Sequence, residues 1–158
     1  MATAFTTASQ ELVFTALNGV LTGCTVFDTA PFLPEGAPAT TFPYCVIGND
    51  TSVPWETDDT LGAEITLTLH FWSRANGMKQ VKALMDQAYG ILNRATLSKI
   101  DYSIVDCLFE FSEALDDPDG QTKHGIQRYR LTIQEVRDDV WQDLRNWNDA
   151  LNWKDGVS

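Results

Sequence analysis

Residues 63–72 alternate between apolar and polar side chains without interruption. A period of two residues predicts a β-strand with one buried face and one exposed face. The apolar face is formed by Ala63, Ile65, Leu67, Leu69 and Phe71, and the polar face by Glu64, Thr66, Thr68, His70 and Trp72. Only the apolar face of this strand needs to be buried, and such strands are typical of an antiparallel sheet that is packed on one side.

Two segments have the apolar spacing of helices that could cover this sheet. The first stripe consists of Leu12, Val13, Ala16, Leu17, Val20 and Leu21. Residues 7–10, with Thr7 and Gln10 at their ends, have the form of a capping box at the start of this helix, and Gly23 follows its end. The second helix runs from Gly77 to about residue 95, with Val81, Leu84, Met85, Ala88, Tyr89 and Leu92 inside. We expect Leu67, Leu69 and Phe71 to pack against Val81, Leu84, Met85 and Leu92.

Four more segments read as strands, at residues 25–28, 42–48, 104–112 and 126–136. In the third, Val105, Cys107, Phe109 and Phe111 are expected to face inward, and in the fourth, Tyr129, Leu131 and Ile133. A turn at residues 116–120 separates these two strands, and a proline-rich loop occupies residues 31–43. The fold class predicted is α+β, with an antiparallel sheet packed by an N-terminal helix and a central helix.

The segment 49–62 is polar and acidic and reads as a long connection between two strands. Connections of this length without internal structure are often functional. We expect it to be poorly ordered until a partner binds, because ordering a polar loop costs conformational entropy. Its candidate residues for facing a partner or a lumen are Asp50, Trp55, Glu56, Asp58 and Asp59.

The chain changes character after residue 137 and holds three tryptophans in its last 21 residues. We therefore divide it into an α+β domain, residues 1–137, and a tryptophan-rich C-terminal extension, residues 138–158. Trp141, Trp147 and Trp153 are spaced by six residues, so they cannot all line one face of a helix. The extension is either a helix docked on its own sheet or a tail that docks on a partner, for which tryptophan is a favoured contact residue.

Charge excludes several functions for this chain of 158 residues, whose formal net charge is −11. The first 73 residues contain eight carboxylates and no Lys or Arg, so this surface should repel nucleic acid. No apolar run is long enough to cross a bilayer, and no basic residue precedes the first helix as in a secretory signal. Cys24, Cys45 and Cys107 read as buried thiols in a reducing compartment, which indicates synthesis in a cytoplasm.

No set of residues in the sequence has the pattern of a catalytic or metal site. His70 lies on the polar face of a strand and His124 near a turn, and each reads as a structural or solvated residue and not as a general base. Residues 117–120 resemble part of a calcium loop, but the required glutamate is missing, so they read as a β-turn. We therefore expect a non-enzymatic protein with no cofactor and no metal.

The order of segments resembles a known family of phage proteins. The specific part is the run 42–48, the acidic segment, and the threonine-rich strand ending in His70, Phe71, Trp72 and Ser73. Gly77 with its helix and the late strand 125–130 continue the pattern. Over about residues 8–137 the chain resembles the tail-completion or tail-terminator family of long-tailed bacteriophages and related phage-like particles. The segment from Asp138 is outside this resemblance.

The resemblance implies a structural virion protein of the tail and neck, assembled in a host bacterium. It implies a ring, usually of six copies, that caps the head-proximal end of the tail tube, ends its polymerisation and joins tail to head. The implied partners are further copies of the chain, the tail tube protein and a head-completion or connector protein. DNA would pass through the ring without specific binding, no membrane is involved, and the acidic surface would keep phosphate from sticking. A closed ring would also cover the free edges of each sheet.

Two other interpretations remain open at the level of sequence. The first is another neck component, a head-completion or stopper protein, which shares the ring and the DNA channel. The second is an acidic inhibitor that mimics DNA, which would be a monomer or dimer with carboxylates spaced like phosphates.

Overall fold

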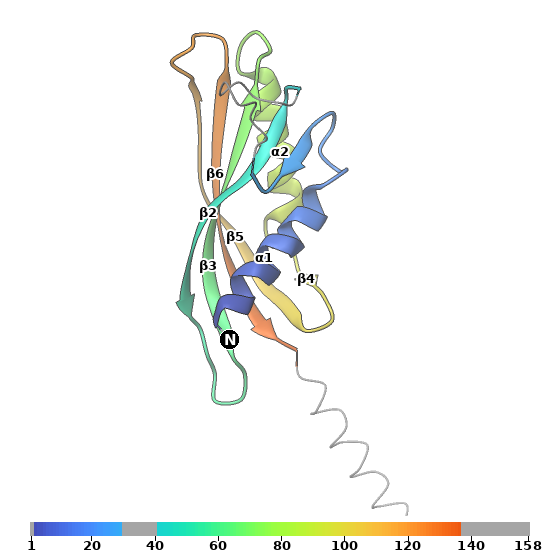
Figure 1. The fold of residues 1–158 in the computed structure, drawn as a ribbon, viewed down its shortest axis with the longest axis vertical. Coiled ribbons are helices and arrows are strands. Elements are labelled where there is room, and N and C mark those ends of the chain that lie inside the picture. The colour runs from blue at the N-terminus through green and yellow to red at the C-terminus, as the bar shows by residue number, and fades with distance from the viewer. Residues whose placement is uncertain (1, 30–40, 137–158) are drawn as a thin grey trace, which may run out of the picture.

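The computed structural model describes residues 2–29 and 41–136. In these ranges the chain forms two helices and six strands, and both helices lie on the same side of a strongly curled sheet (Figure 1). The elements are α1 (Ala2–Leu17), β1 (Thr25–Phe27), β2 (Tyr44–Pro54), β3 (Gly62–Ser73), α2 (Lys79–Leu92), β4 (Leu97–Ser98), β5 (Tyr102–Asp116) and β6 (Lys123–Glu135). The predicted α+β class is confirmed. The predicted C-terminal extension, with Trp141, Trp147 and Trp153, and most of the proline-rich loop lie outside the described residues.

The sheet is mixed and not purely antiparallel as expected. Its strand order is β1-β2-β3-β6-β5-β4, and every neighbouring pair is antiparallel except β1 and β2, which are parallel. The register shows this parallel pair, because Thr25 at the start of β1 lies beside Tyr44 at the start of β2.

Strand β3 occupies the middle of the sheet, between β2 and β6, and carries the core. Its burial alternates residue by residue, as the sequence predicts, with Ile65, Leu69 and Phe71 fully buried. These side chains belong to one hydrophobic cluster with α2 residues Val81, Leu84, Met85, Ala88 and Leu92. The predicted packing of the strand on the second helix is therefore confirmed.

Helix α1 begins earlier and ends earlier than its sequence pattern suggests. It starts at Ala2, so Thr7 and Gln10 lie within the helix and do not cap it. Buried Ser9 instead donates its hydroxyl to the carbonyl of Thr6 at 2.9 Å. The helix ends at Leu17 and the chain turns at Gly19 with φ of +79°, which leaves Val20 56% exposed although it was expected inside.

Two β-bulges change which side chains of β5 face the core. The register with β6 shifts between Ile104 and Asp106 and again between Phe109 and Phe111. A bulge inserts one residue and therefore reverses the alternation of side chains beyond it. Val105 and Phe111, expected inside, are 45% and 40% exposed, while Ile104 and Cys107 are buried. On β6 the expected inward residues Tyr129, Leu131 and Ile133 are fully buried.

Helix α2 places its predicted stripe in the core except at one position. Tyr89 is 44% exposed, and its ring makes an edge-to-face contact with Phe109 at 5.3 Å between centroids. Its hydroxyl accepts a hydrogen bond from the Asn93 side chain. Tyr89 therefore covers the border between α2 and β5 and does not enter the core.

The acidic segment 49–62 is not a long loop. Strand β2 continues through Asp50 to Pro54 and pairs with β3, with a register shift between Ile47 and Asp50. Only residues 55–61 connect the strands, and they close through mutual hydrogen bonds between Thr57 and Thr60. The expectation of a poorly ordered segment is thus wrong for residues 49–54, which form part of the sheet.

Candidate functional site

The candidate residues from the sequence lie on the β2–β3 hairpin, at one end of the sheet (Figure 1). Asp50 is half-buried within β2, whereas Trp55, Glu56, Asp58 and Asp59 are exposed in the connection. Backbone pairing holds this hairpin closed, because the Trp55 N–H donates to the Gly62 carbonyl at 3.0 Å. The hairpin therefore displays three carboxylates and one indole on a short, ordered turn.

A second candidate surface is a hollow at the opposite end of the sheet, on the face that the helices do not cover. It has a volume of about 690 Å³ and lies between the start of β2, the ends of β3 and the β5–β6 turn. Its floor carries an aromatic row on neighbouring strands, formed by Tyr44, Trp72, His124 and His70. No pattern in the sequence marks this hollow, because its lining residues come from segments that are far apart in the chain.

Strand pairing brings the two histidines together although they are 54 residues apart. β3 pairs with β6 so that Trp72 is opposite His124 and His70 is opposite Ile126. The Trp72 and His124 rings stack at 3.8 Å between centroids, with 7° between their planes. One ring nitrogen donates to the other between His70 Nδ1 and His124 Nε2, at 2.8 Å. The two histidines are therefore structural residues that contact each other, and only the β3–β6 register reveals the pair.

Burial lowers the pKa of both histidines below the usual 6.5. The charge that His70 would carry lowers the pKa of His124 further, and the carboxylate of Asp117 opposes this effect in part. Because a proton on one ring repels a proton on the other, the neutral pair is favoured at pH 7. Two nitrogens from one pair do not make a metal site, and the part of the chain that the structure describes contains no cluster of three ligating side chains.

We predict that the histidine pair makes the folded state lose stability as the pH falls below 6.5. The unfolded chain binds protons at the ordinary histidine pKa, whereas the folded chain binds them only at lower pH, so stability is full above 6.5 and declines below it. Urea unfolding at pH 7.5, 6.5 and 5.5 measures this. The control is the double variant His70→Gln/His124→Gln, which should show a smaller decline; an equal decline would assign the effect to other groups.

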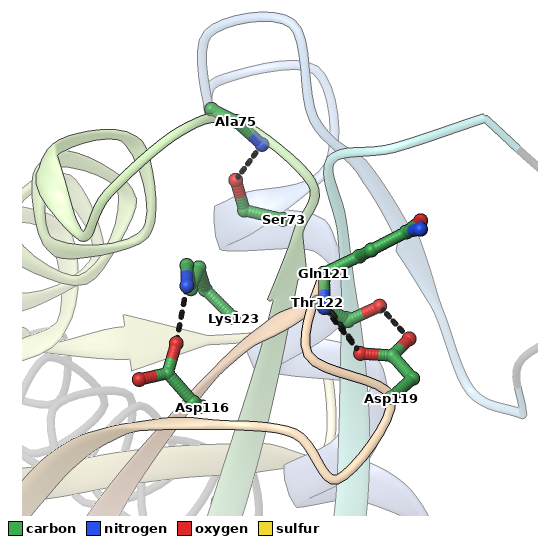
Figure 2. Close-up of polar contacts among 7 residues, drawn as sticks. All are labelled: Ser73, Ala75, Asp116, Asp119, Gln121, Thr122 and Lys123. Carbon is green, nitrogen blue, oxygen red and sulfur yellow. Dashed lines mark hydrogen bonds and ion pairs between the residues drawn. The ribbon is translucent and has the colours of Figure 1, made fainter.

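The rim of the hollow is formed by Arg74 and the β5–β6 turn, and Figure 2 shows the polar contacts within this turn. Asp119 accepts hydrogen bonds from the backbone of Gln121 and Thr122 and from the Thr122 hydroxyl. The Thr122 hydroxyl, then these backbone groups, lower the pKa of Asp119 to about 2. The Arg74 Nε donates to the Thr122 hydroxyl at 3.2 Å. The turn is therefore an ordered corner with a charged rim.

Arg74 also contacts Phe42, whose ring lies against Tyr44 of the aromatic row; the Arg74 guanidinium is over the Phe42 ring at 4.4 Å from the centroid. The same Arg74 is 4.0 Å from the Asp119 carboxylate. On the other side of this turn, Lys123 forms an ion pair with Asp116, and Ser73 accepts a hydrogen bond from the backbone of Ala75 (Figure 2). These contacts join β3, β6 and the turn into one rigid end of the sheet.

Within residues 2–29 and 41–136, the cysteines do not form a reactive site. The three cysteines are buried and unpaired with one another. Burial raises the pKa of Cys24 to about 11 and that of Cys107 to about 12, and it raises the pKa of Cys45 as well. They are therefore protonated at neutral pH and are poor nucleophiles. None of the helices in the described ranges has the length and apolar character needed to cross a membrane.

Comparison with known proteins connects this fold to one family. Residues 12–134 match the family described as "Tail completion protein gp17", a range that includes the last six residues of α1 and nearly all of β6. The tail completion protein gp17 of Bacillus phage SPP1 is 33% identical over 95 residues, which cover 58% of this chain and 68% of the relative.

A solved structure has the same fold. One chain of the virion of a native gene transfer agent particle superimposes with a TM-score of 0.70 at 20% sequence identity. The alignment covers 83% of this chain and 98% of that one, so the likeness extends over the whole of that chain.

Proposed function

Because this chain belongs to the tail completion protein gp17 family, we propose that it forms a ring, with six copies as the expected number, at the head-proximal end of the phage tail tube. Proteins of this family are structural and non-enzymatic, and the chain is a component of the virion tail. In our proposal the ring ends tube polymerisation, contacts the tail tube protein on one side and a head-completion or connector protein on the other, and lets DNA pass.

The observation that carries this proposal is the family match over residues 12–134. It includes the end of α1, all of α2 and nearly the whole of every long strand, so the likeness rests on the sheet and its central helix and not on a single motif. Membership of a tail completion family also favours a tail ring over a DNA-mimic inhibitor. The division into a domain of residues 1–137 and an extension of residues 138–158 agrees with the family match ending at residue 134.

Electron microscopy of purified tails tests the position and the ring directly. A gold-labelled antibody to this chain should bind the head-proximal end of the tail, and averaged images should show a ring of copies there. Particles made without the chain should contain filled heads that are not joined to tails. Label at the distal end, or joined particles in its absence, would contradict the proposal.

We propose further that the acidic hairpin faces the DNA path. Glu56, Asp58 and Asp59 are exposed and lie on a short turn that extends from the sheet. Carboxylates in that position would repel phosphate and keep DNA from adhering during its passage. Asp50 and Trp55, at the base of the same hairpin, and Trp141, Trp147 and Trp153, outside the described residues, are proposed to contact partners.

The triple variant Glu56→Gln/Asp58→Asn/Asp59→Asn should fold normally and slow genome ejection. Solvated charges contribute little to stability, so the unfolding midpoint should stay within the error of measurement. The delay should be largest at low ionic strength, where screening is weakest. Ejection is timed by dye entry into DNA at two salt concentrations, with Glu11→Gln on α1, which is also exposed, as the control. Ejection that is unchanged at both concentrations would place these carboxylates away from the DNA.

A further inference from the structure

Each end of the sheet is five strands wide, but the five strands differ between the ends. One row of paired residues runs from β1 to β5 through Thr25, Tyr44, Trp72, His124 and Leu115. The row near the other end runs from β2 to β4 through Pro54, Ala63, Ile133, Ile104 and Leu97. As a result β1 is the outermost strand, beside β2, at one end of the sheet. At the other end β4 is the outermost strand, beside β5 (Figure 1).

These short strands leave most of their long neighbours uncovered. β1 pairs only with residues 44–46 of β2, and β4 only with Ser103 and Ile104 of β5. Beyond β4, two residues that follow α2 bind the backbone of β5. The Arg94 N–H donates to the Cys107 carbonyl, and the Phe109 N–H donates to the side-chain oxygen of Asn93. Within the described ranges no strand pairs with the outer edge of β5 at residues 111–116 or of β2 at residues 50–54. Open edges of this kind are templates for pairing with another chain.

We propose that these two edges join neighbouring copies of the chain through an overlapping contact between strands, which we call the joint. β1 of one copy lies against the free part of β5 of the next copy, and β4 of that next copy lies against the free part of β2. This inference rests on the proposed function, because it assumes the ring and identifies the surfaces through which neighbouring copies contact each other. The projecting strand on each edge fits the recess on the other edge without a shift along the strands.

Strand direction is compatible with a ring. β2, β3, β6 and β5 alternate in direction, and β1 runs parallel to β2. Rotation about an axis that runs roughly along the strands preserves their directions, so β5 of one copy meets β1 of the next as an antiparallel pair. A contact between two different surfaces of one chain is heterologous and closes into a ring when the rotation allows it.

One pair of opposite charges lies at matching heights on the two edges. The register across the sheet places Phe27 of β1 level with Glu113 of β5. Asp28 is the residue after Phe27, and it therefore lies level with Ser112. Ser112 and Lys82 line the same groove of about 660 Å³ between α2 and β5. Asp28 of one copy therefore approaches Lys82 of the next.

A second pair lies lower on the same edges. The backbone N–H of Arg94 is bonded to the Cys107 carbonyl, and Cys107 is level with Ser52 of β2, two residues from Asp50. None of Asp28, Asp50, Lys82 and Arg94 forms an ion pair among the residues that the structure describes. The stepped outlines of the two edges identify the occupant of each as a second copy of this chain, because the short strand that projects on one edge matches the recess on the other. The two ion pairs add to this match, although Asp86 and Glu113 line the same groove as Lys82.

Site-directed cross-linking tests the joint in assembled tails and in the full-length chain at high concentration. Thr25→Cys and Leu115→Cys place thiols in the same row on the two edges. A short bis-maleimide should link the two single variants when they are mixed and should link neither variant to itself. The double variant should give a ladder that stops at the size of the closed ring. The native cysteines are buried with raised pKa values and should not react.

The matched control mixes Thr25→Cys with Thr51→Cys, two positions on the same edge, and should give no cross-link. Self-linking of either single variant would indicate a symmetric pair and overturn the joint. No cross-link in tails that show the ring by electron microscopy would overturn the joint and leave the ring standing. Tails that contain the chain without any ring would overturn both.

Charge reversal gives a second, independent readout. Lys82→Glu or Asp28→Lys alone should lower the association constant at least about tenfold, because like charges then face each other across the contact. The double variant Lys82→Glu/Asp28→Lys should recover most of the loss, and Arg94→Glu with Asp50→Arg should behave in the same way. Each single variant must retain the unfolding midpoint of the parent. Additive losses in the double variants would contradict the assignment of these pairs.

Discussion

Leu69→Ala should lower the free energy of unfolding by about 2–5 kcal/mol, since it removes a fully buried side chain and leaves a cavity. Leu69 is in β3 between β2 and β6, and its side chain lies in the cluster that includes Val81 and Leu84 of α2. Strands that are paired on both sides cannot collapse easily into the vacated space, which favours a large loss. For a domain of ordinary stability the loss is a large fraction of the total.

Urea denaturation followed by tryptophan fluorescence measures this loss. The control is Val53→Ala on β2, where the side chain is 52% exposed and the change should cost well under 1 kcal/mol. A loss below about 1 kcal/mol at Leu69 would mean that the helical layer repacks into the cavity.

The sequence predicts elements well where a pattern is long and the environment is uniform. β3 alternates for ten residues because it is paired on both sides and covered on one face. β6 and the inner stripe of α2 follow for the same reason. At these positions the local pattern and the packing agree, so sequence periodicity is sufficient.

The sequence misleads where an extra residue or an edge changes the environment. The bulges of β5 reverse its alternation, and no residue type marks them in advance, so Val105 and Phe111 were placed inside. The second half of β2 is exposed on both faces and therefore has the polar composition of a loop. Residues of an edge strand can be polar on both faces, and only its pairing with β3 identifies it as a strand.

The hollow at the end of the sheet opposite the acidic hairpin could not be predicted from the sequence. His70 and His124 lie 54 residues apart, and their contact depends on the β3–β6 register and on the stacking of Trp72 on His124. A signal was present, since each histidine lies beside a predicted strand end with an outward side chain. Pairing two such positions requires the strand order, which the alternation of single strands does not provide.

Gly62→Ala is expected to destabilise the domain although it adds only one methyl group. A Cβ at position 62 would meet the carbonyl oxygen of Trp55 at 2.4 Å and that of Ile133 at 2.8 Å. Both are backbone atoms held by strand pairing, so neither can move aside without breaking the start of β3 from β2 or β6. Overpacking of this kind costs about 1–3 kcal/mol and occasionally more.

The matched control is Gly90→Ala on the exposed side of α2, where a Cβ meets nothing within 4 Å. There the same change should stabilise the domain by about 0.5–1 kcal/mol, because alanine loses less conformational entropy than glycine in a helix. Opposite signs for one chemical change would separate the steric effect at Gly62 from any general effect of the methyl group. Amide hydrogen exchange should locate the damage, with faster exchange confined to the paired residues around Trp55 and Ile133. If both variants are stabilised, the hairpin end of the sheet is looser than the pairing of β2, β3 and β6 indicates, and the acidic turn would then lack the rigid base that a lumen-facing position requires.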